Sequence, residues 1–327
     1  MEKSNEFRAE ILLIIAGLSF GNTPILSAFL RDHAVSSLEQ VFIRSFIASL
    51  FGIAVILSFY LTKRTQIIDS LSTANQFLYI IQAIILNFMI LVYFISISLN
   101  TPAGEAALLV QIHPILTILL GILLLHERID KDRIISLFIA LSGIIILIRP
   151  WEANEFFTHI VGDVFAMLNG VFYSFYLIVG RYAKDKRNKI SPLLSIGFVM
   201  FWTFIAYIPL LVIMMSLPLP PVINAFTLTV YSNSYVILLG ILLGLLGSVL
   251  PYGLIMIASG HVETSRQAIL LLGEPLGAII FGLLLLQEPI TIFYGIGGGL
   301  ILFAVIYLTY RGTRPSTKAT IVIPNNN

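Results

Sequence analysis

GHVETSRQAILLLGEPLGAIIFGLLLLQEPIT, residues Gly260–Thr291, is the stretch that decides the fold of this chain. An apolar run of helix length carries a carboxylate, Glu274, near its middle, and Pro275 follows it directly. A second such pair, Glu288-Pro289, closes the run. An ionisable group is costly inside a bilayer and points to a functional site, and a proline interrupts a helix. The stretch therefore predicts a functional membrane helix.

The same pattern occurs earlier in the chain, in Asn100–Ile129, read NTPAGEAALLVQIHPILTILLGILLLHERI. A shift of 161 residues superimposes three matched pairs, which are His113 on Glu274, Pro114 on Pro275, and Glu127 on Glu288. Interrupted helices at corresponding positions of two halves are typical of secondary transporters, whose site lies near the midplane where the halves meet. We therefore expect an internal repeat with a site in mid-membrane.

Composition excludes several classes of protein. Of the 327 residues, 58% are hydrophobic and only 11% are charged, whereas a soluble globular domain has about 25% charged residues. The net charge of +2 is too small to suggest nucleic acid as a partner. The absence of cysteine excludes disulfides, zinc thiolate sites and iron–sulfur clusters. The sequence thus predicts an integral membrane protein without a cofactor.

Ten stretches match the roughly 20 apolar residues that a membrane helix needs. They cover residues 10–30, 38–61, 75–98, 103–125, 134–149, 160–182, 191–216, 233–258, 263–286 and 291–310. Lys and Arg accumulate in cytoplasmic loops. With the N-terminus placed inside, fifteen basic residues fall in inner segments and two in outer ones. The bias predicts that both termini are cytoplasmic. We expect the membrane to be a prokaryotic cell membrane.

The spans divide into two halves of five, and an odd number per half inverts the second half relative to the first. We expect an all-α integral membrane fold of ten transmembrane helices, arranged as two inverted five-helix repeats around a central cavity. The predicted organisation is a cytoplasmic N-terminus over 1–9, repeats over 10–149 and 160–310, a linker over 150–159, and a disordered cytoplasmic tail over 311–327.

Polar and aromatic side chains in mid-span are the candidates for substrate contact. They are Glu274, His113, Asn22, Asn169, Tyr173, Tyr176, Asn87, Gln111, Gln267, Trp202 and Tyr252. For the amides, the alternative is a hydrogen bond that ties two helices together. His113 is the expected protein partner of Glu274, and a substrate ammonium is the expected ligand. Both side chains titrate, which makes protons the candidate coupling ion; a purely structural Glu–His hydrogen bond is the alternative.

A second group of residues predicts gating or structural roles: Pro114, Pro275, Glu127, Glu288 and Arg44. The prolines free backbone groups and supply bends. Glu127 and Glu288 end their helices, where a carboxylate is unfavourable, so an Arg or the backbone amides of a neighbouring helix should compensate. Arg44 is expected to reach the membrane surface or to pair with Glu105, with contact to a substrate anion as the alternative. Arg266 is expected to pair locally with Glu263.

The repeated pattern of a proline, small residues and an aliphatic run ending in Glu resembles the drug/metabolite transporter superfamily, specifically the EamA-type ten-span permeases. It reads Pro114…GILLLHE (121–127) and Pro275…GLLLLQE (282–288), and Arg44 in FIRSF is also similar to the family. The resemblance covers 10–310 and implies a central cavity, alternating access, and export of amino acids, drugs or similar metabolites. The chain differs in having His126 and Gln287 where the family commonly has Gly, and His113 where an apolar residue is usual.

The sequence thus predicts a secondary transporter, with lipid around it and a small molecule as its substrate, and we expect export. An exchanger of phosphorylated or nucleotide-linked sugars is the alternative, but it needs several cavity cations, and Arg44 and Arg266 both lie near span ends. A lipid-acting membrane enzyme would need a catalytic dyad or metal set, and a channel a selectivity filter. Neither pattern is in the sequence. A monomer and a homodimer are both compatible with it.

Overall fold

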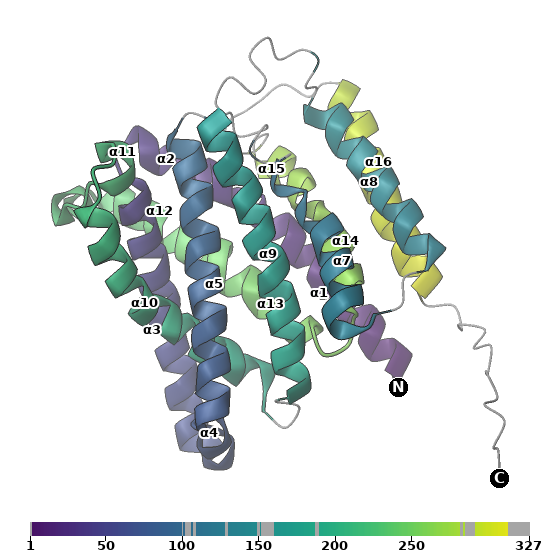
Figure 1. Cartoon of the computed structure of the whole chain (residues 1–327), viewed down its shortest axis with the longest axis horizontal. Coiled ribbons are helices and arrows are strands. Elements are labelled where there is room, and N and C mark those ends of the chain that lie inside the picture. Colours follow the sequence, from purple (N-terminus) through teal and green to yellow (C-terminus); the bar gives the residue numbers. More distant parts are fainter. Residues whose placement is uncertain are drawn as a thin grey trace.

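The computed structural model describes residues 2–99, 101, 106, 109–127, 130–148, 151, 160–186, 190–281, 284 and 292–312, and within them it contains helices and no strand. The helices of the first half are α1 (Glu2–Phe20), α2 (Asn22–Asp32), α3 (Ser37–Thr62), α4 (Arg64–Ser70), α5 (Thr73–Ser98), α7 (His113–Leu125) and α8 (Lys131–Ile148). Those of the second half are α9 (Ile160–Lys186), α10 (Pro192–Ser216), α11 (Pro221–Asn224), α12 (Ser234–Gly244), α13 (Leu250–Ala258), α14 (Thr264–Leu270), α15 (Glu274–Phe281) and α16 (Ile292–Gly312). Figure 1 shows how they are arranged.

Six helical stretches are long and apolar enough to cross a membrane: Asn5–Asp32, Ser37–Thr62, Thr73–Ser98, Ile160–Lys184, Pro192–Ser216 and Ser234–Ala258. Two shorter apolar helices cover His113–Leu125 and Gly295–Tyr310. Each of the ten predicted spans contains a helix, while ten crossings and the inversion of the halves stay predictions. The predicted tail, apart from residues 311 and 312, and the linker, apart from Trp151, lie outside the described residues.

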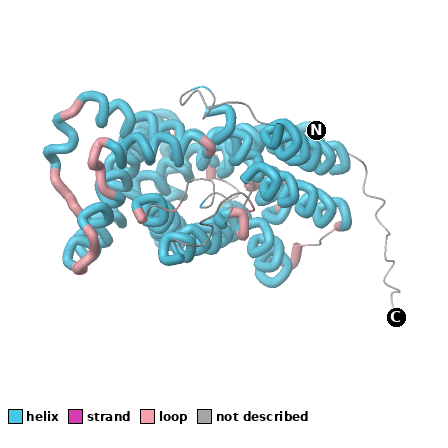
Figure 2. The backbone as a smooth tube through the Cα atoms, turned by 90° about the horizontal axis from the view of Figure 1, so that it is seen from above, coloured by secondary structure: helices cyan, strands magenta, loops and turns pink. Residues whose placement is uncertain are grey.

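The two sequence halves interleave instead of forming separate bodies. The extensive helix contacts pair α8 with α16, α5 with α9, α3 with α10, and α1 with α13. Each of these pairs joins one helix of residues 10–149 to one of residues 160–310. Figure 1 shows the α8–α16 pair at one edge, and Figure 2 shows the elongated bundle from above. A cavity inside this bundle is therefore lined by both halves.

Several of the described spans are interrupted inside the bundle. A π-helical turn, η2 (Leu245–Val249), separates α12 from α13, and a 3-10 turn, η3 (Leu271–Gly273), precedes α15. The break between α1 and α2 falls at Gly21, where the chain crosses α15 closely. A Cβ added to Gly21 would lie 2.1 Å from the Ala278 nitrogen, and one added to Gly277 would lie 2.0 Å from the Leu18 oxygen. Only glycine allows this approach of two backbones.

The two prolines of the repeat each follow a break, as their missing amide donor predicts. Pro275 is the second residue of α15, directly after η3. Pro114 is the second residue of α7, directly after a turn at Gln111 and Ile112. Both helices thus begin in the interior of the protein, at positions that the 161-residue shift relates.

One end of the bundle holds the N-terminus of α1 and the C-termini of α3 and α9, and it lies at the bottom of Figure 1. We call it the basic end, because Lys63, Lys184 and Lys186 lie there. The loop between α13 and α14 belongs to the same end, since Arg181 of α9 donates to the Ser259 oxygen at 2.6 Å.

Glu127 has the partners that its position requires. Its carboxylate accepts hydrogen bonds from the Thr264 nitrogen at 2.6 Å, the Ser265 nitrogen at 3.0 Å and the Ser265 hydroxyl at 2.7 Å. These amides belong to the first turn of α14, where a negative charge is favourable. The expectation of backbone amides from a neighbouring helix is confirmed for Glu127, whereas Glu288 lies outside the described residues.

The predicted local pair of Arg266 with Glu263 is wrong. Arg266 pairs with Glu10 of α1, lies 3.4 Å from Glu6 and donates to the Leu308 oxygen at 2.8 Å. Glu263 pairs instead with Arg133 of α8. Glu263 has an extended backbone before α14 begins, so the helical spacing behind the prediction does not apply. The buried Glu10, 1% exposed, needs the nearby cation.

Candidate functional site

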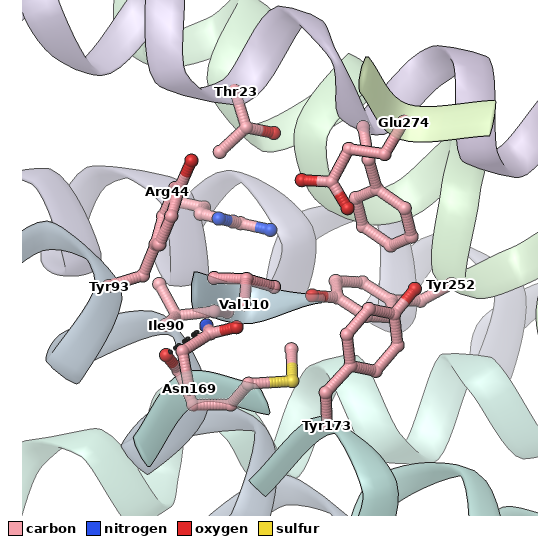
Figure 3. A pocket seen from close by; sticks show the side chains of 11 residues that line it. Thr23, Arg44, Ile90, Tyr93, Val110, Asn169, Tyr173, Tyr252 and Glu274 are labelled. Carbon is pink, nitrogen blue, oxygen red and sulfur yellow. Dashed lines mark hydrogen bonds between the residues drawn. The ribbon is translucent and has the colours of Figure 1, made fainter. Parts of the chain in front are cut away.

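A small polar cavity lies in the interior of the bundle, where the interrupted spans meet. Its volume is about 30 Å³, which is room for one or two water molecules. Helices of both halves line it with Phe20, Thr23, Arg44, Met89, Ile90, Tyr93, Val110, Asn169, Tyr173, Tyr252 and Glu274 (Figure 3). A metabolite fits only after helices move apart. We call this the central cavity.

Two opposite charges face each other in the central cavity. Figure 3 shows the Glu274 carboxylate and the Arg44 guanidinium pointing toward one another from opposite walls. Glu274 begins α15 and is brought inward by the break at η3, whereas Arg44 comes from α3. In the described part of the chain they form no direct ion pair, so each can face a charged group of a ligand.

Arg44 is held in place by the π-helical turn. Its Nε donates to the Ser248 hydroxyl and its Nη2 to the Gly247 oxygen. This carbonyl has no regular helical donor, because the residue four positions later is Pro251. The guanidinium carbon lies 5.8 Å from the ring centre of Phe94 and 5.9 Å from that of Tyr252, within the range of a cation–π interaction. These groups solvate the charge inside the protein.

The expectation that Arg44 reaches the membrane surface is therefore wrong, because the side chain is 3% exposed. Its expected partner Glu105 lies outside the described residues.

Two predicted asparagines flank the central cavity and tie helices together. Asn169 lines the cavity and donates to the Met89 oxygen of α5 at 2.7 Å. Asn22 donates to the Leu246 oxygen in η2 at 3.3 Å and to the Ser19 oxygen. It does not itself line the cavity. Asn22 thus fixes the interrupted backbone of η2, and Asn169 joins the continuous helices α9 and α5, which is the structural alternative for such amides.

His113 does not pair with Glu274. Its ring is fully buried and stacks on Tyr173 with 4.3 Å between ring centres. Neither ring nitrogen has a hydrogen-bond partner within the described residues. Tyr173 lines the central cavity and His113 does not, so the tyrosine covers the histidine on that side. The repeat relates the two backbone positions, but it does not decide which side chains meet.

Three other predicted residues lie away from the central cavity. Trp202 donates to Gln76 Oε1 at 2.7 Å, and Asn87 donates to the Thr203 oxygen at 2.8 Å. Both bonds join α5 to α10, so these two side chains act between helices. Gln111 is buried and lines neither this cavity nor the smaller one described next.

Tyr176 and Gln267 line a second, smaller cavity of about 10 Å³, nearer the basic end. We call this the inner cavity. Tyr173 and Tyr252 stay with the central cavity. Of the predicted aromatic and amide candidates, Asn169, Tyr173 and Tyr252 thus line the central cavity, and Tyr176 and Gln267 line the inner one.

Thr23 and Tyr93 line the central cavity but were not predicted from the sequence. Thr23 directly follows the predicted Asn22, and its buried hydroxyl has no hydrogen-bond partner within the described residues. Tyr93 is the one tyrosine in the second half of α5. A polar hydroxyl in an apolar span is a weak signal, but it was present at both positions.

A bundle of apolar helices with charged groups converging on an interior cavity defines a class of protein, the membrane transporters. The sequence model of the EamA-like transporter family matches residues 7–149 and again residues 160–310. The chain belongs to this family and is an integral membrane protein.

Several proteins are similar to this chain. An uncharacterized transporter of Archaeoglobus fulgidus is 24% identical over 91% of this chain and 94% of its own length. A probable amino-acid metabolite efflux pump of Salmonella typhimurium is 26% identical over 70% of this chain and 74% of its own. A solved crystal structure matches 93% of this chain and 97% of its own with a TM-score of 0.70 and 16% identity. The last match concerns the fold alone.

Proposed function

We propose that this chain is a secondary carrier that exports a small zwitterionic metabolite, such as an amino acid, by alternating access. The observation that carries the proposal is the Glu274 carboxylate facing the Arg44 guanidinium across the central cavity. An ammonium group on the substrate would meet Glu274, and a carboxylate would meet Arg44. The Salmonella relative, named as an amino-acid metabolite efflux pump, supports this class of substrate and the direction.

The balance of charge favours a zwitterion. A buried charge without a partner is costly, and a ligand with one charge of each sign satisfies both side chains at once. Charge-assisted hydrogen bonds are also about twice as strong as neutral ones. The rings of Phe20, Tyr173 and Tyr252 form an apolar wall beside the charged groups. That wall suits the side chain of an amphipathic substrate.

Exchange of phosphorylated or nucleotide-linked sugars fits the site less well. A phosphate carries more than one negative charge and calls for several cations. Among the described lining residues of the central cavity, Arg44 is the one cation, and it faces a carboxylate. Arg266 is already paired with Glu10.

Alternating access is the mechanism that the interrupted helices support. The central cavity is too small for a metabolite, so α1–α2, α12–α13 and α14–α15 would have to move at their breaks. The two family matches correspond to the two five-span repeats that we propose as inverted halves. In this topology the basic end faces the cytoplasm.

Protons are the proposed coupling ion. In the carboxylate form, Glu274 binds the substrate ammonium. When Glu274 takes a proton from hydronium on the side opposite the basic end, its O–H bond forms and a water molecule is left behind. The ammonium then loses its partner and the substrate leaves. When that bond breaks again, the proton passes to water, and Glu274 can bind the next substrate. A single group would thus hold a proton and a substrate in turn.

Uptake by proteoliposomes tests this function. The purified chain is reconstituted and offered a panel of radiolabelled amino acids with an imposed pH difference. We expect saturable transport of at least one of them, loss of this transport in Glu274→Gln, and normal transport in Asp69→Asn, an acid in α4 outside both cavities. Absence of transport for every amino acid, or full activity in Glu274→Gln, would refute the proposal.

A further inference from the structure

The inner cavity lies on the same helix faces as the central cavity. On α9, Tyr173 lines the central cavity and Gly180 lines the inner one, seven residues further along. Tyr252 of α13 lines the central cavity, and Ser259, which directly follows α13 and comes seven residues later, lines the inner one. Seven residues are two helical turns, or about 10 Å along the axis. The two cavities are therefore stacked along one direction, with the inner cavity nearer the basic end.

The other two walls follow the same pattern. On α5, Gln82 lines the inner cavity, and Met89, seven residues later, lines the central one. In the α14–α15 span, Gln267 lines the inner cavity, and Glu274, again seven residues later, lines the central one. Four spans thus present one continuous face to both cavities, which is the geometry of a single path.

A contact between two tyrosines separates the cavities. Tyr252 lines the central cavity and Tyr176 lines the inner one, and their rings meet edge to face with centres 5.2 Å apart. Phe20 packs on Tyr252 at 5.0 Å and on Tyr173 at 5.9 Å. Movement of one of these rings away from the other would connect the two cavities.

Polar residues take part in the lining of the inner cavity. Gln267 is fully buried and lines the cavity. Its Nε2 donates to the Val262 oxygen at 2.7 Å, while its Oε1 has no hydrogen-bond partner within the described residues. Gln82 and Ser259 are the other uncharged polar residues of a lining that also contains Leu177, Ile255 and Met256. A buried unpaired carbonyl is costly in a membrane protein, so it indicates a polar ligand or water.

We propose that the inner cavity is a second substrate subsite on the way to the basic end, and that Tyr176 and Tyr252 are the gate between the two sites. The proposal rests on the transport function proposed above. The inner subsite offers neutral amides and a hydroxyl, whereas the central cavity offers two charges. Neutral hydrogen bonds are weaker than charge-assisted ones, so a zwitterion is bound less tightly in the inner subsite. A weaker site next to the central cavity favours movement of the substrate toward the basic end over its retention in the protein.

Thiol labelling tests the gate directly, because the chain contains no cysteine. Thr23→Cys places a reporter in the central cavity and Ser259→Cys places one in the inner cavity. Ile255→Cys, also on the inner cavity, serves as a second reporter if Ser259→Cys does not fold. A charged, membrane-impermeant methanethiosulfonate is then added to either face of oriented proteoliposomes.

From the basic end, we expect Ser259→Cys to react faster than Thr23→Cys while the gate is intact, because alternating access opens the central cavity to that end only part of the time. Tyr176→Ala should raise the rate at Thr23→Cys to that at Ser259→Cys. Equal rates at the two reporters with Tyr176 intact, or no change at Thr23→Cys in Tyr176→Ala, would refute the gate. Absence of labelling at both inner reporters would refute the path. These results do not depend on transport, so they remain decisive even if no amino acid is transported.

Substrate kinetics test the inner subsite itself. When substrate enters from the basic end, Gln267→Leu should raise the apparent KM for the transported amino acid about three- to tenfold. This is the effect expected from the loss of one neutral hydrogen bond. The KM from the opposite face should stay unchanged. Gln111→Leu is the matched control, since Gln111 is a buried amide that lines neither cavity. An equal rise on both faces, or no rise, would overturn the subsite.

Discussion

Glu274 and Arg44 are 230 positions apart in the chain, yet their charged groups point toward each other across one cavity. The break at η3 directs the first inward, and the π-helical turn at η2 holds the second. Each charge is thus placed by an irregular segment of helix. The site depends on the interruptions as much as on the charged residues.

His113 is expected to support Tyr173 through packing. His113→Phe keeps a ring against Tyr173 and should transport within about twofold of the unmodified chain. His113→Ala removes a buried ring, a change that costs about 3–5 kcal/mol for a large aromatic side chain, and it should lower both the melting temperature and the transport rate. Loss of transport in a well-folded His113→Phe would instead show that the imidazole itself takes part.

Glu127 is expected to stabilise the first turn of α14. Glu127→Gln keeps the size of the side chain and removes its charge. Loss of a helix N-terminal cap costs about 0.5–2 kcal/mol, so the melting temperature in detergent should fall by several degrees. Glu263→Gln is a comparison at the same end, because it affects the contact with Arg133 only. An unchanged melting temperature in Glu127→Gln would contradict this role.

His126→Gly is expected to stabilise the chain. His126 ends α7 with a φ of 55°, and the left-handed region costs an L-residue about 1–2 kcal/mol. Glycine avoids that cost but loses more entropy on folding, about 0.5–1 kcal/mol. The net gain should be small and positive, and a scan of thermal unfolding measures it. A lower melting temperature would mean that the imidazole makes a contact that outweighs the strain.

Gly21→Ala is expected to prevent correct folding. The added Cβ would meet the Ala278 nitrogen at 2.1 Å, and overpacking of this kind costs about 1–3 kcal/mol or more. Gly299→Ala is the matched control, because a Cβ there meets nothing within 4 Å. The yield of monodisperse protein in detergent should fall for the first variant and stay normal for the second. Equal yields would contradict the close crossing of α1–α2 and α15.

The positions of the helices could be predicted from the sequence because long apolar runs have one stable form in a bilayer. The breaks before Pro114 and Pro275 were predictable from chemistry local to proline. The amide partners of Glu127 followed from the sign of the helix dipole. Each of these conclusions needs only a short stretch of sequence.

The partners of the buried charges could not be predicted, because they depend on packing. Arg44 donates to the Gly247 carbonyl, which Pro251 leaves without its helical donor, but the sequence does not show which side chain will bind there. Arg266 forms an ion pair with Glu10 of α1, and not with Glu263 three residues before it in the chain. The repeat suggested His113 for Glu274, but Tyr173 covers the histidine.

Equilibrium binding to the purified chain tests the central claim most directly. The ligands are the transported amino acid, the amine that lacks its carboxylate, and the acid that lacks its ammonium. Loss of one charged hydrogen bond costs about 1.5–3 kcal/mol, or roughly 10- to 100-fold in affinity. We predict that the amino acid binds that much more tightly than either analogue. Its advantage over the acid should disappear in Glu274→Gln, and its advantage over the amine in Arg44→Gln. The same ranking of the three ligands in both variants would contradict the account.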